Sequence, residues 1–172
     1  MKKPVLIHKI CAVGILLLML AGVVALSCSK NSSTPTPAQA SPQASLTRVD
    51  GGEGSVTVQA TWVNSAHLKD LPQDALKGYP QDQYVLIHVA LDTHSVDLSK
   101  YDLSSLAYLS DGAASPVSAV GWVSLSDTGH HRSGVIAFSG MSNQDWASKY
   151  QAARLVVKGV AGVPERVFAW DF

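Results

Sequence analysis

The segment Tyr84-Val85-Leu86-Ile87-His88-Val89-Ala90-Leu91-Asp92 decides the fold class. Every second position, from Val85 to Leu91, carries a branched apolar side chain, whereas the positions between them are mixed. Because successive side chains of a strand point to opposite faces, this period of two predicts a strand with one buried face. Residues 56–62 repeat the pattern, since valine, alanine and tryptophan alternate there with threonine and glutamine. Both stretches indicate a β-rich domain.

Five shorter strands are expected further along, at residues 105–110, 117–125, 134–139, 154–158 and 166–172. Short turns rich in glycine and aspartate separate most of them. Two interruptions are predicted to be helical, at residues 64–78 and 142–150. The second opens with Ser142-Asn143-Gln144-Asp145, which has the form of a capping box. Short strands with this spacing predict an all-β, antiparallel sandwich.

The segments at 84–91, 105–112, 134–138 and 155–157 resemble small immunoglobulin-like domains of bacterial lipoproteins, many of which have no assigned function. The resemblance covers residues 83–172 and consists of strand and turn types, without a catalytic motif. It implies an immunoglobulin-like β-sandwich of about seven strands with one or two short helical insertions. A fold of this kind does not identify an activity. One core is expected to join Val58, Ile87, Val89, Phe138 and Val157.

The first 28 residues combine lysines at positions 2, 3 and 9, an apolar run over residues 10–26, and then Ser27 and Cys28. This order resembles a bacterial lipoprotein signal peptide, which implies that residues 1–27 are removed and that Cys28 carries lipid. The alternative is an uncleaved membrane anchor, because the apolar run is nearly long enough to span a bilayer. Both interpretations place the rest of the chain in the cell envelope, facing the periplasm or the cell exterior.

Residues 28–45 are expected to form a lipidated, disordered tether, because serine, threonine, proline and alanine dominate them. From residue 46 to 172 the composition is uniform, which predicts a single domain. Cys11 and Cys28 are the chain's two cysteines, so the expected domain contains neither thiol nor disulfide. This excludes thiol catalysis and thiolate metal sites.

Loss of the leader would remove three of the 13 basic residues and none of the 13 acidic ones. The mature chain would therefore be weakly acidic, which argues against nucleic acid as a partner because nucleic-acid binding needs clustered cations. It also argues against electrostatic attraction to anionic lipid. The lipid anchor is therefore expected to provide the membrane attachment.

Histidines are the chemically suggestive residues of the expected domain. In an immunoglobulin-like order, the strands at 84–92 and 132–139 pair antiparallel, which brings His94 beside His130 and His131. Asp92 and Arg132 would share that end of the sandwich. Imidazoles with a carboxylate can hold copper or zinc, so these three histidines are candidate metal ligands. The alternative is that the polar side chains hydrogen-bond loop backbone and order the loops, since no spacing matches a known metal motif.

Hydrolase motifs are absent: the sequence has no Gly-x-Ser-x-Gly elbow, no His-Glu-x-x-His and no phosphate-binding glycine loop. Asp97 and Asp102 are expected to form turns. His88 lies in mid-strand and is expected to pack across strands. Trp122 falls on the polar face of its expected strand and is the candidate exposed aromatic side chain for binding carbohydrate.

These features predict a membrane-anchored, non-enzymatic lipoprotein. Its β-sandwich would bind an envelope protein through a loop face that includes Asp92 and Arg132. One alternative is a lipoprotein that binds copper or zinc through His94, His130 and His131. A second alternative is a carbohydrate-binding module that uses Trp122. The sequence assigns no catalytic residue and no cofactor beyond the copper or zinc of the first alternative.

Overall fold

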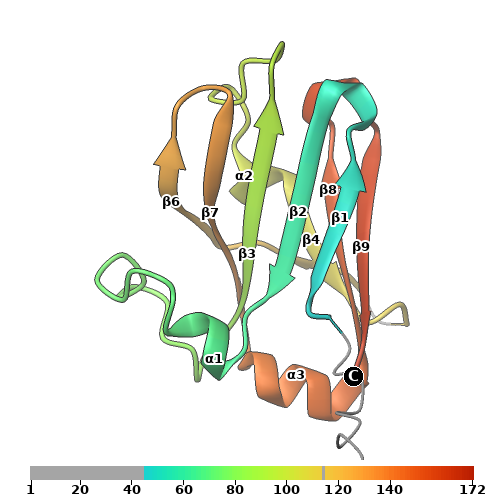
Figure 1. Ribbon diagram of the computed structural model, residues 1–172. Helices are drawn as coiled ribbons and strands as arrows, with labels where there is room; N and C mark the ends of the chain where they lie inside the picture. Colours follow the sequence, from blue (N-terminus) through green and yellow to red (C-terminus); the bar gives the residue numbers. More distant parts are fainter. Residues whose placement is uncertain (1–44, 114) are drawn as a thin grey trace, which may run out of the picture. The chain divides into compact units, whose positions relative to one another are not determined.

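The computed structural model describes residues 45–113 and 115–172, which form a β-sandwich (Figure 1). The leader, Cys28 and the tether before Ser45 lie outside the described residues. No helix in the part of the chain that the structure describes is long and apolar enough to cross a membrane.

Two antiparallel sheets make up the sandwich. The five-stranded sheet has the order β1-β2-β3-β7-β6, and the four-stranded sheet has the order β5-β4-β8-β9. The strands of the first sheet are β1 Thr47–Gly51, β2 Val56–Trp62, β3 Tyr84–Thr93, β6 Gly121–Asp127 and β7 His131–Ser139. Those of the second are β4 Ala107–Ser110, β5 Val117–Ser118, β8 Ala152–Lys158 and β9 Glu165–Asp171.

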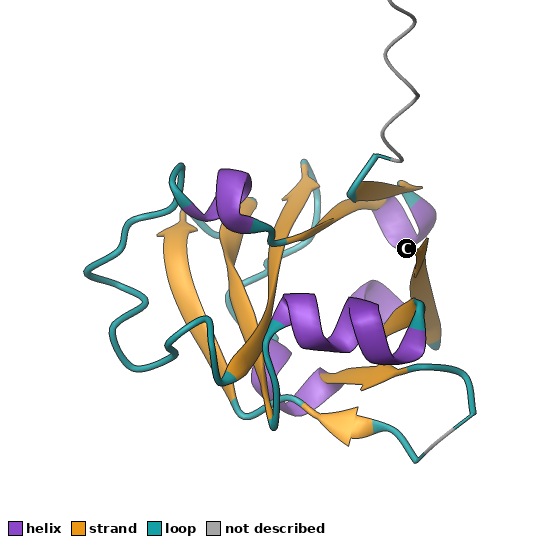
Figure 2. Cartoon of the chain, turned by 90° about the horizontal axis from the view of Figure 1, so that it is seen from below, coloured by secondary structure: helices purple, strands orange, loops and turns teal. Residues whose placement is uncertain are grey.

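Short helices connect the strands. The α-helices are α1 Ser65–Leu68, α2 Leu103–Leu106 and α3 Asn143–Tyr150, and the 3-10 helices are η1 Glu53–Ser55 and η2 Val160–Gly162. Ser142 caps α3 as expected, because its Oγ accepts the Asp145 backbone N–H at 3.0 Å. Figure 2 shows α3 lying across one end of the sandwich.

The core between the sheets confirms the predicted stripe of β3, since Val85, Ile87, Val89 and Leu91 are all buried there. The five residues expected to share one core belong to this cluster: Val58, Ile87, Val89, Phe138 and Val157. Trp62 and Trp170 close the core near α3, with ring centroids 5.6 Å apart. In the absence of a disulfide among the described residues, this apolar burial stabilises the domain.

A second apolar cluster lies on the other face of the five-stranded sheet. Leu86, Val135 and Ala137 are buried there against Val63, Leu71 and Leu76, which belong to the segment between β2 and β3. This segment folds over the outer face, so β3 is buried on both sides near Leu86. The double burial explains why residues 85–87 form a continuous apolar run.

The observed elements differ from the expected ones in several places. The unpredicted helix α2 occupies the start of the strand expected at 105–110, so β4 begins at Ala107. The sheets contain nine strands, because β1 was not predicted and because the strand expected at 117–125 is divided. Its first part, β5, pairs with β4, whereas its second part, β6, pairs with β7 in the opposite sheet. The helix expected over 64–78 is reduced to α1 and a series of turns, because Pro72 cannot continue a helix.

Candidate functional site

The loops at one end of the sandwich form a continuous surface, which we call the loop end: residues 92–102, 127–133 and 159–164. β3 pairs with β7 in the expected register, which places Asp92 opposite His131. Backbone hydrogen bonds continue the contact beyond the sheet, from Thr93 N–H to the His130 carbonyl and from Leu98 N–H to the Gly129 carbonyl. The Tyr101 hydroxyl accepts the Ala161 N–H at 3.0 Å and joins the third loop.

The three histidines of the loop end are all exposed, as is Asp92. His131 Nδ1 lies 2.7 Å from Asp92 Oδ1, and the His131 ring lies edge-on to His94 with centroids 6.4 Å apart. His130 Nδ1 instead contacts the Val96 carbonyl oxygen at 3.1 Å. The loop end therefore contains one histidine–carboxylate pair, whereas the His130 ring contacts the loop backbone.

A metal site at the loop end would require several ligand side chains to point toward one position. Among residues 45–113 and 115–172, no three or more His, Cys, Asp or Glu side chains are grouped so that they could hold a metal ion. The strand pairing places His94, His130 and His131 in neighbouring loops, but the His130 ring contacts the Val96 carbonyl oxygen. The geometry does not favour a three-histidine centre.

Arg132 lies at the loop end but does not present its charge to solvent. Its side chain is only 10% exposed, and its Nε lies 3.0 Å from Asp127 Oδ2. Its guanidinium also donates hydrogen bonds to the carbonyls of Leu98 and Tyr101. These contacts fasten the loop after β3 to the β6–β7 turn, which is the loop-ordering role considered from the sequence.

Trp122 is half-buried on the core side of β6, contrary to its expected place on the outer face. It pairs with Ile136, and a Cβ added to Gly134 would lie 2.5 Å from its ring. The Arg132 guanidinium covers the ring at 5.4 Å from its centroid. The predicted orientation of Trp122 was wrong because the strand expected at 117–125 is broken before Gly121. The break changes which face of the sheet the following side chains point to. Trp122 therefore does not form an open aromatic platform.

Asp97 and Asp102 form turns, as the sequence predicts. Asp97 Oδ1 accepts hydrogen bonds from the backbone N–H and hydroxyl of Ser99, and Asp102 Oδ1 accepts the same pair from Ser104 at the start of α2. These hydrogen bonds stabilise the charged carboxylates and lower the pKa of both side chains. The two residues order the loop that leads from His94 to α2.

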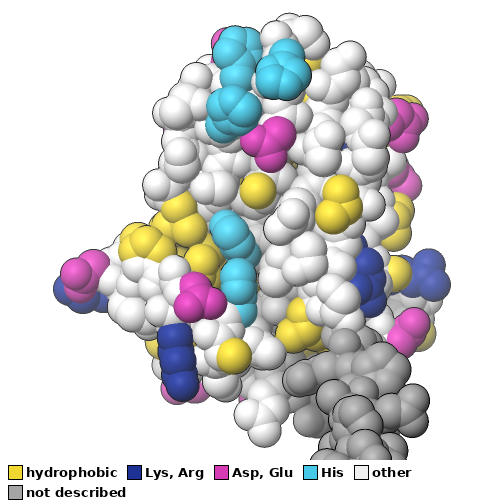
Figure 3. Space-filling model, viewed as in Figure 1, with side chains coloured by type: hydrophobic (Ala, Val, Ile, Leu, Met, Phe, Trp, Pro, Cys, Tyr) yellow, Lys and Arg dark blue, Asp and Glu magenta, His cyan; other side chains and the backbone are white. Residues whose placement is uncertain are grey.

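A second histidine pair lies on the outer face of the five-stranded sheet. His67 Nε2 in α1 is 3.3 Å from His88 Nδ1 in β3, and both rings are half-buried. Figure 3 shows histidine side chains in two groups on this face of the molecule. Partial burial lowers the pKa of His88, and a charge on His67 lowers it further. No sequence signal linked these residues, because the segment that carries His67 is joined to the sheet only by tertiary packing.

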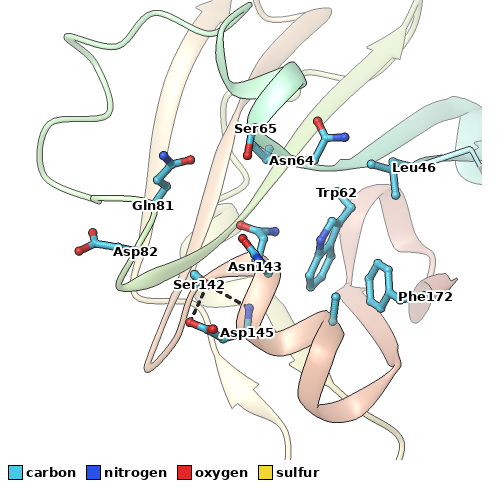
Figure 4. Close-up of a pocket in the computed structure, with 13 residues that line it drawn as sticks. Leu46, Trp62, Asn64, Ser65, Gln81, Asp82, Ser142, Asn143, Asp145 and Phe172 are labelled. Atoms are coloured by element: carbon cyan, nitrogen blue, oxygen red, sulfur yellow. Dashed lines mark hydrogen bonds between the residues drawn. The ribbon is translucent and has the colours of Figure 1, made fainter.

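A hollow of about 570 Å³ lies at the end opposite the loops, between α1, α3 and the C-terminus (Figure 4). Three of its polar side chains have structural roles. Asn64 caps α1, Ser142 caps α3, and Asn143 exchanges two hydrogen bonds with the backbone of Leu86. The aromatic part is the Trp62–Phe172 contact, with centroids 4.8 Å apart. The three polar side chains therefore hold the surrounding elements in place.

Comparison with known proteins returns no match to a protein-family model, a curated protein or a solved structure.

Proposed function

We propose that this protein is an envelope lipoprotein, anchored by lipid on Cys28, whose immunoglobulin-like sandwich is a non-enzymatic binding or accessory module. Its loop end contacts a protein partner of the envelope. The order β2-β3-β7-β6 in one sheet and β4-β8-β9 in the other corresponds to the A-B-E-D and C-F-G orders of immunoglobulin domains. This correspondence supports an immunoglobulin-like fold. The proposed binding role rests on the geometry of the loop end, because a fold does not identify a function.

The direction of β1 is the observation that carries the proposal. β1 begins at Thr47, which is paired with Thr61 near the α3 end of the sandwich. The loop end lies at the other end of the same sheet, where Val56 is paired with Thr93. The described chain thus enters the domain at the end opposite the loops (Figure 1). An anchor that precedes this entry would attach to the domain at the α3 end, which would leave the loop end uncovered by the attachment and accessible to a partner.

The ordering of the loop end also supports a binding role. Backbone hydrogen bonds and the buried guanidinium of Arg132 join its first two loops, and the Tyr101 hydroxyl joins the third. Its exposed side chains include His94, His130 and the His131–Asp92 pair. A surface that is already ordered loses less conformational entropy on binding than a flexible one. The loop end can therefore present a fixed pattern of hydrogen-bonding groups.

The anchor is tested by mass spectrometry of the protein isolated from membranes of a bacterial host. We expect a mature chain that begins at Cys28 and carries lipid, and we expect Cys28→Ser to block processing or release the domain from the membrane. Recovery of the wild-type protein with residues 1–27 intact would contradict the proposed processing.

The binding role is tested by isolating the full-length protein from detergent-solubilised envelopes of its native bacterium. The loop-end variant combines His94→Ala, His130→Ala and His131→Ala. Its matched control carries three changes at the opposite end, Gln81→Ala, Asp82→Ala and Gln144→Ala. We expect a protein partner to remain with the wild type and the control and to be lost from the loop-end variant. Equal retention by all three proteins would contradict a binding surface at the loop end.

A further inference from the structure

We propose that His67 and His88 form an open two-histidine site for a divalent transition metal such as Zn²⁺ on the outer face of the five-stranded sheet. This site is separate from the loop end and does not depend on the function proposed there. It also differs from the copper or zinc site that the sequence suggested at His94, His130 and His131.

Distance is the first argument. The His67 Nε2 and His88 Nδ1 atoms are 3.3 Å apart. Two imidazole nitrogens bound to one tetrahedral Zn²⁺ at about 2.0–2.1 Å lie about 3.3–3.4 Å from each other. The two nitrogens therefore already have the separation that a tetrahedral ion requires. The ring centroids are 5.3 Å apart, and the ring planes form an angle of 33°. Both nitrogens therefore lie on the ring edges that face each other.

The supports of the two rings give the second argument. His88 lies within β3, paired with Thr61 on one side and Val135 on the other. His67 lies in α1, where the Asn64 side chain accepts its backbone N–H at 2.8 Å. The segment after α1 is held over the sheet by the apolar cluster of Leu71, Leu76 and Leu86. The fold therefore holds both imidazoles in place before a metal arrives, which reduces the ordering cost of binding.

Ligand chemistry identifies the class of ion. Neutral imidazole suits zinc, copper and nickel, and hard cations such as Mg²⁺ and Ca²⁺ prefer oxygen. No third His, Cys, Asp or Glu of the described residues joins the pair. The remaining coordination positions therefore belong to water or to a ligand from outside the chain. An open site of this kind holds its ion less tightly than a closed structural centre.

The test uses the full-length protein, purified in detergent without a histidine tag and stripped with a chelator. Calorimetric titration with Zn²⁺ should show saturable binding near one equivalent per chain. Loss of an outer-shell partner already lowers metal affinity by about 10–100-fold, so loss of a ligand should lower it at least tenfold. We expect that loss in His67→Ala and in His88→Ala, and unchanged affinity in the matched control His94→Ala.

A second measurement needs no variant and so does not depend on the folding of the altered chains. In the wild-type protein labelled with ¹³C at histidine rings, Zn²⁺ should shift the ring signals of His67 and His88 and leave those of His94, His130 and His131 in place. Absence of saturable binding would overturn the proposal and leave the contact as a hydrogen bond between two imidazoles. Binding that shifts the loop-end signals, or that is lost in His94→Ala alone, would overturn it as well.

Discussion

Arg166 is the most deeply buried charged side chain among the described residues, at 2% exposure. Its guanidinium donates to Asp50 Oδ2 and to the Glu53 carbonyl, so it joins β9 of one sheet to the β1–η1 turn of the other. A buried charge of this kind depends on its partner, because removal of one member leaves the other without compensation. The pair therefore links the two open edges of the sandwich.

We predict that Asp50→Ala lowers the free energy of unfolding by about 3 kcal/mol, because it leaves the Arg166 charge uncompensated. Glu165→Ala is the matched control, since Glu165 forms an ion pair with Lys158 at 3.1 Å in which both side chains are about half-exposed. Exposed pairs contribute at most about 1 kcal/mol. Urea unfolding followed by circular dichroism measures both changes. Equal losses in the two variants would contradict the structural role assigned to Arg166.

His88 is predicted to make stability depend on pH. Its pKa is lowered in the folded protein, chiefly by burial, so the unfolded chain binds a proton more tightly at this residue. Its contribution should be complete above about pH 6.5, the usual histidine pKa, and should decline as the pH falls below that value. Thermal melts from about pH 8 to pH 5, with chelator present, should show a smaller decline in His88→Gln than in the wild type. Identical declines would show that His88 does not carry the effect.

Among the elements, β2 and β3 were predictable because their alternation reflects a buried inner face. β1 was not, because its apolar side chain, Val49, is 60% exposed and the strand lies at the sheet edge with no apolar stripe. The chain also crosses from one sheet to the other between β5 and β6, and no regular spacing of apolar residues marks this crossing in the sequence. The strand pairing that places His94 near His131 was predicted, but the His67–His88 contact was not. That contact depends on how the segment before β3 folds over the sheet.

The close packing of β6 on β7 depends on Gly134. A Cβ at this position would lie 2.4 Å from the Val123 carbonyl oxygen and 2.5 Å from the Trp122 ring. We predict that Gly134→Ala lowers the free energy of unfolding by about 1–3 kcal/mol through overpacking. Gly78→Ala is the matched control, because a Cβ there would meet no atom within 4 Å. Guanidinium unfolding of both variants tests the packing, and a Gly134→Ala protein as stable as the control would contradict it.

In the whole molecule, the two ends of the sandwich differ. The chain enters the domain at the α3 end, near Leu46 and Trp62, and the histidine-bearing loops lie at the other end. Three polar side chains that line the hollow at the α3 end cap helices or hold backbone. The loop end presents exposed histidines and Asp92 on ordered loops. Contacts with a partner are therefore expected at the loop end.

Site-specific photo-crosslinking in intact cells shows which end of the domain contacts a partner. A photoreactive amino acid is placed either at His94 in the loop end or at Gln81 beside the hollow, both of which are exposed. The full-length protein is then irradiated in cells of its native host. We predict a discrete crosslinked protein product from position 94 and none from position 81. A product from position 81 alone, or no product from position 94, would contradict partner binding at the loop end.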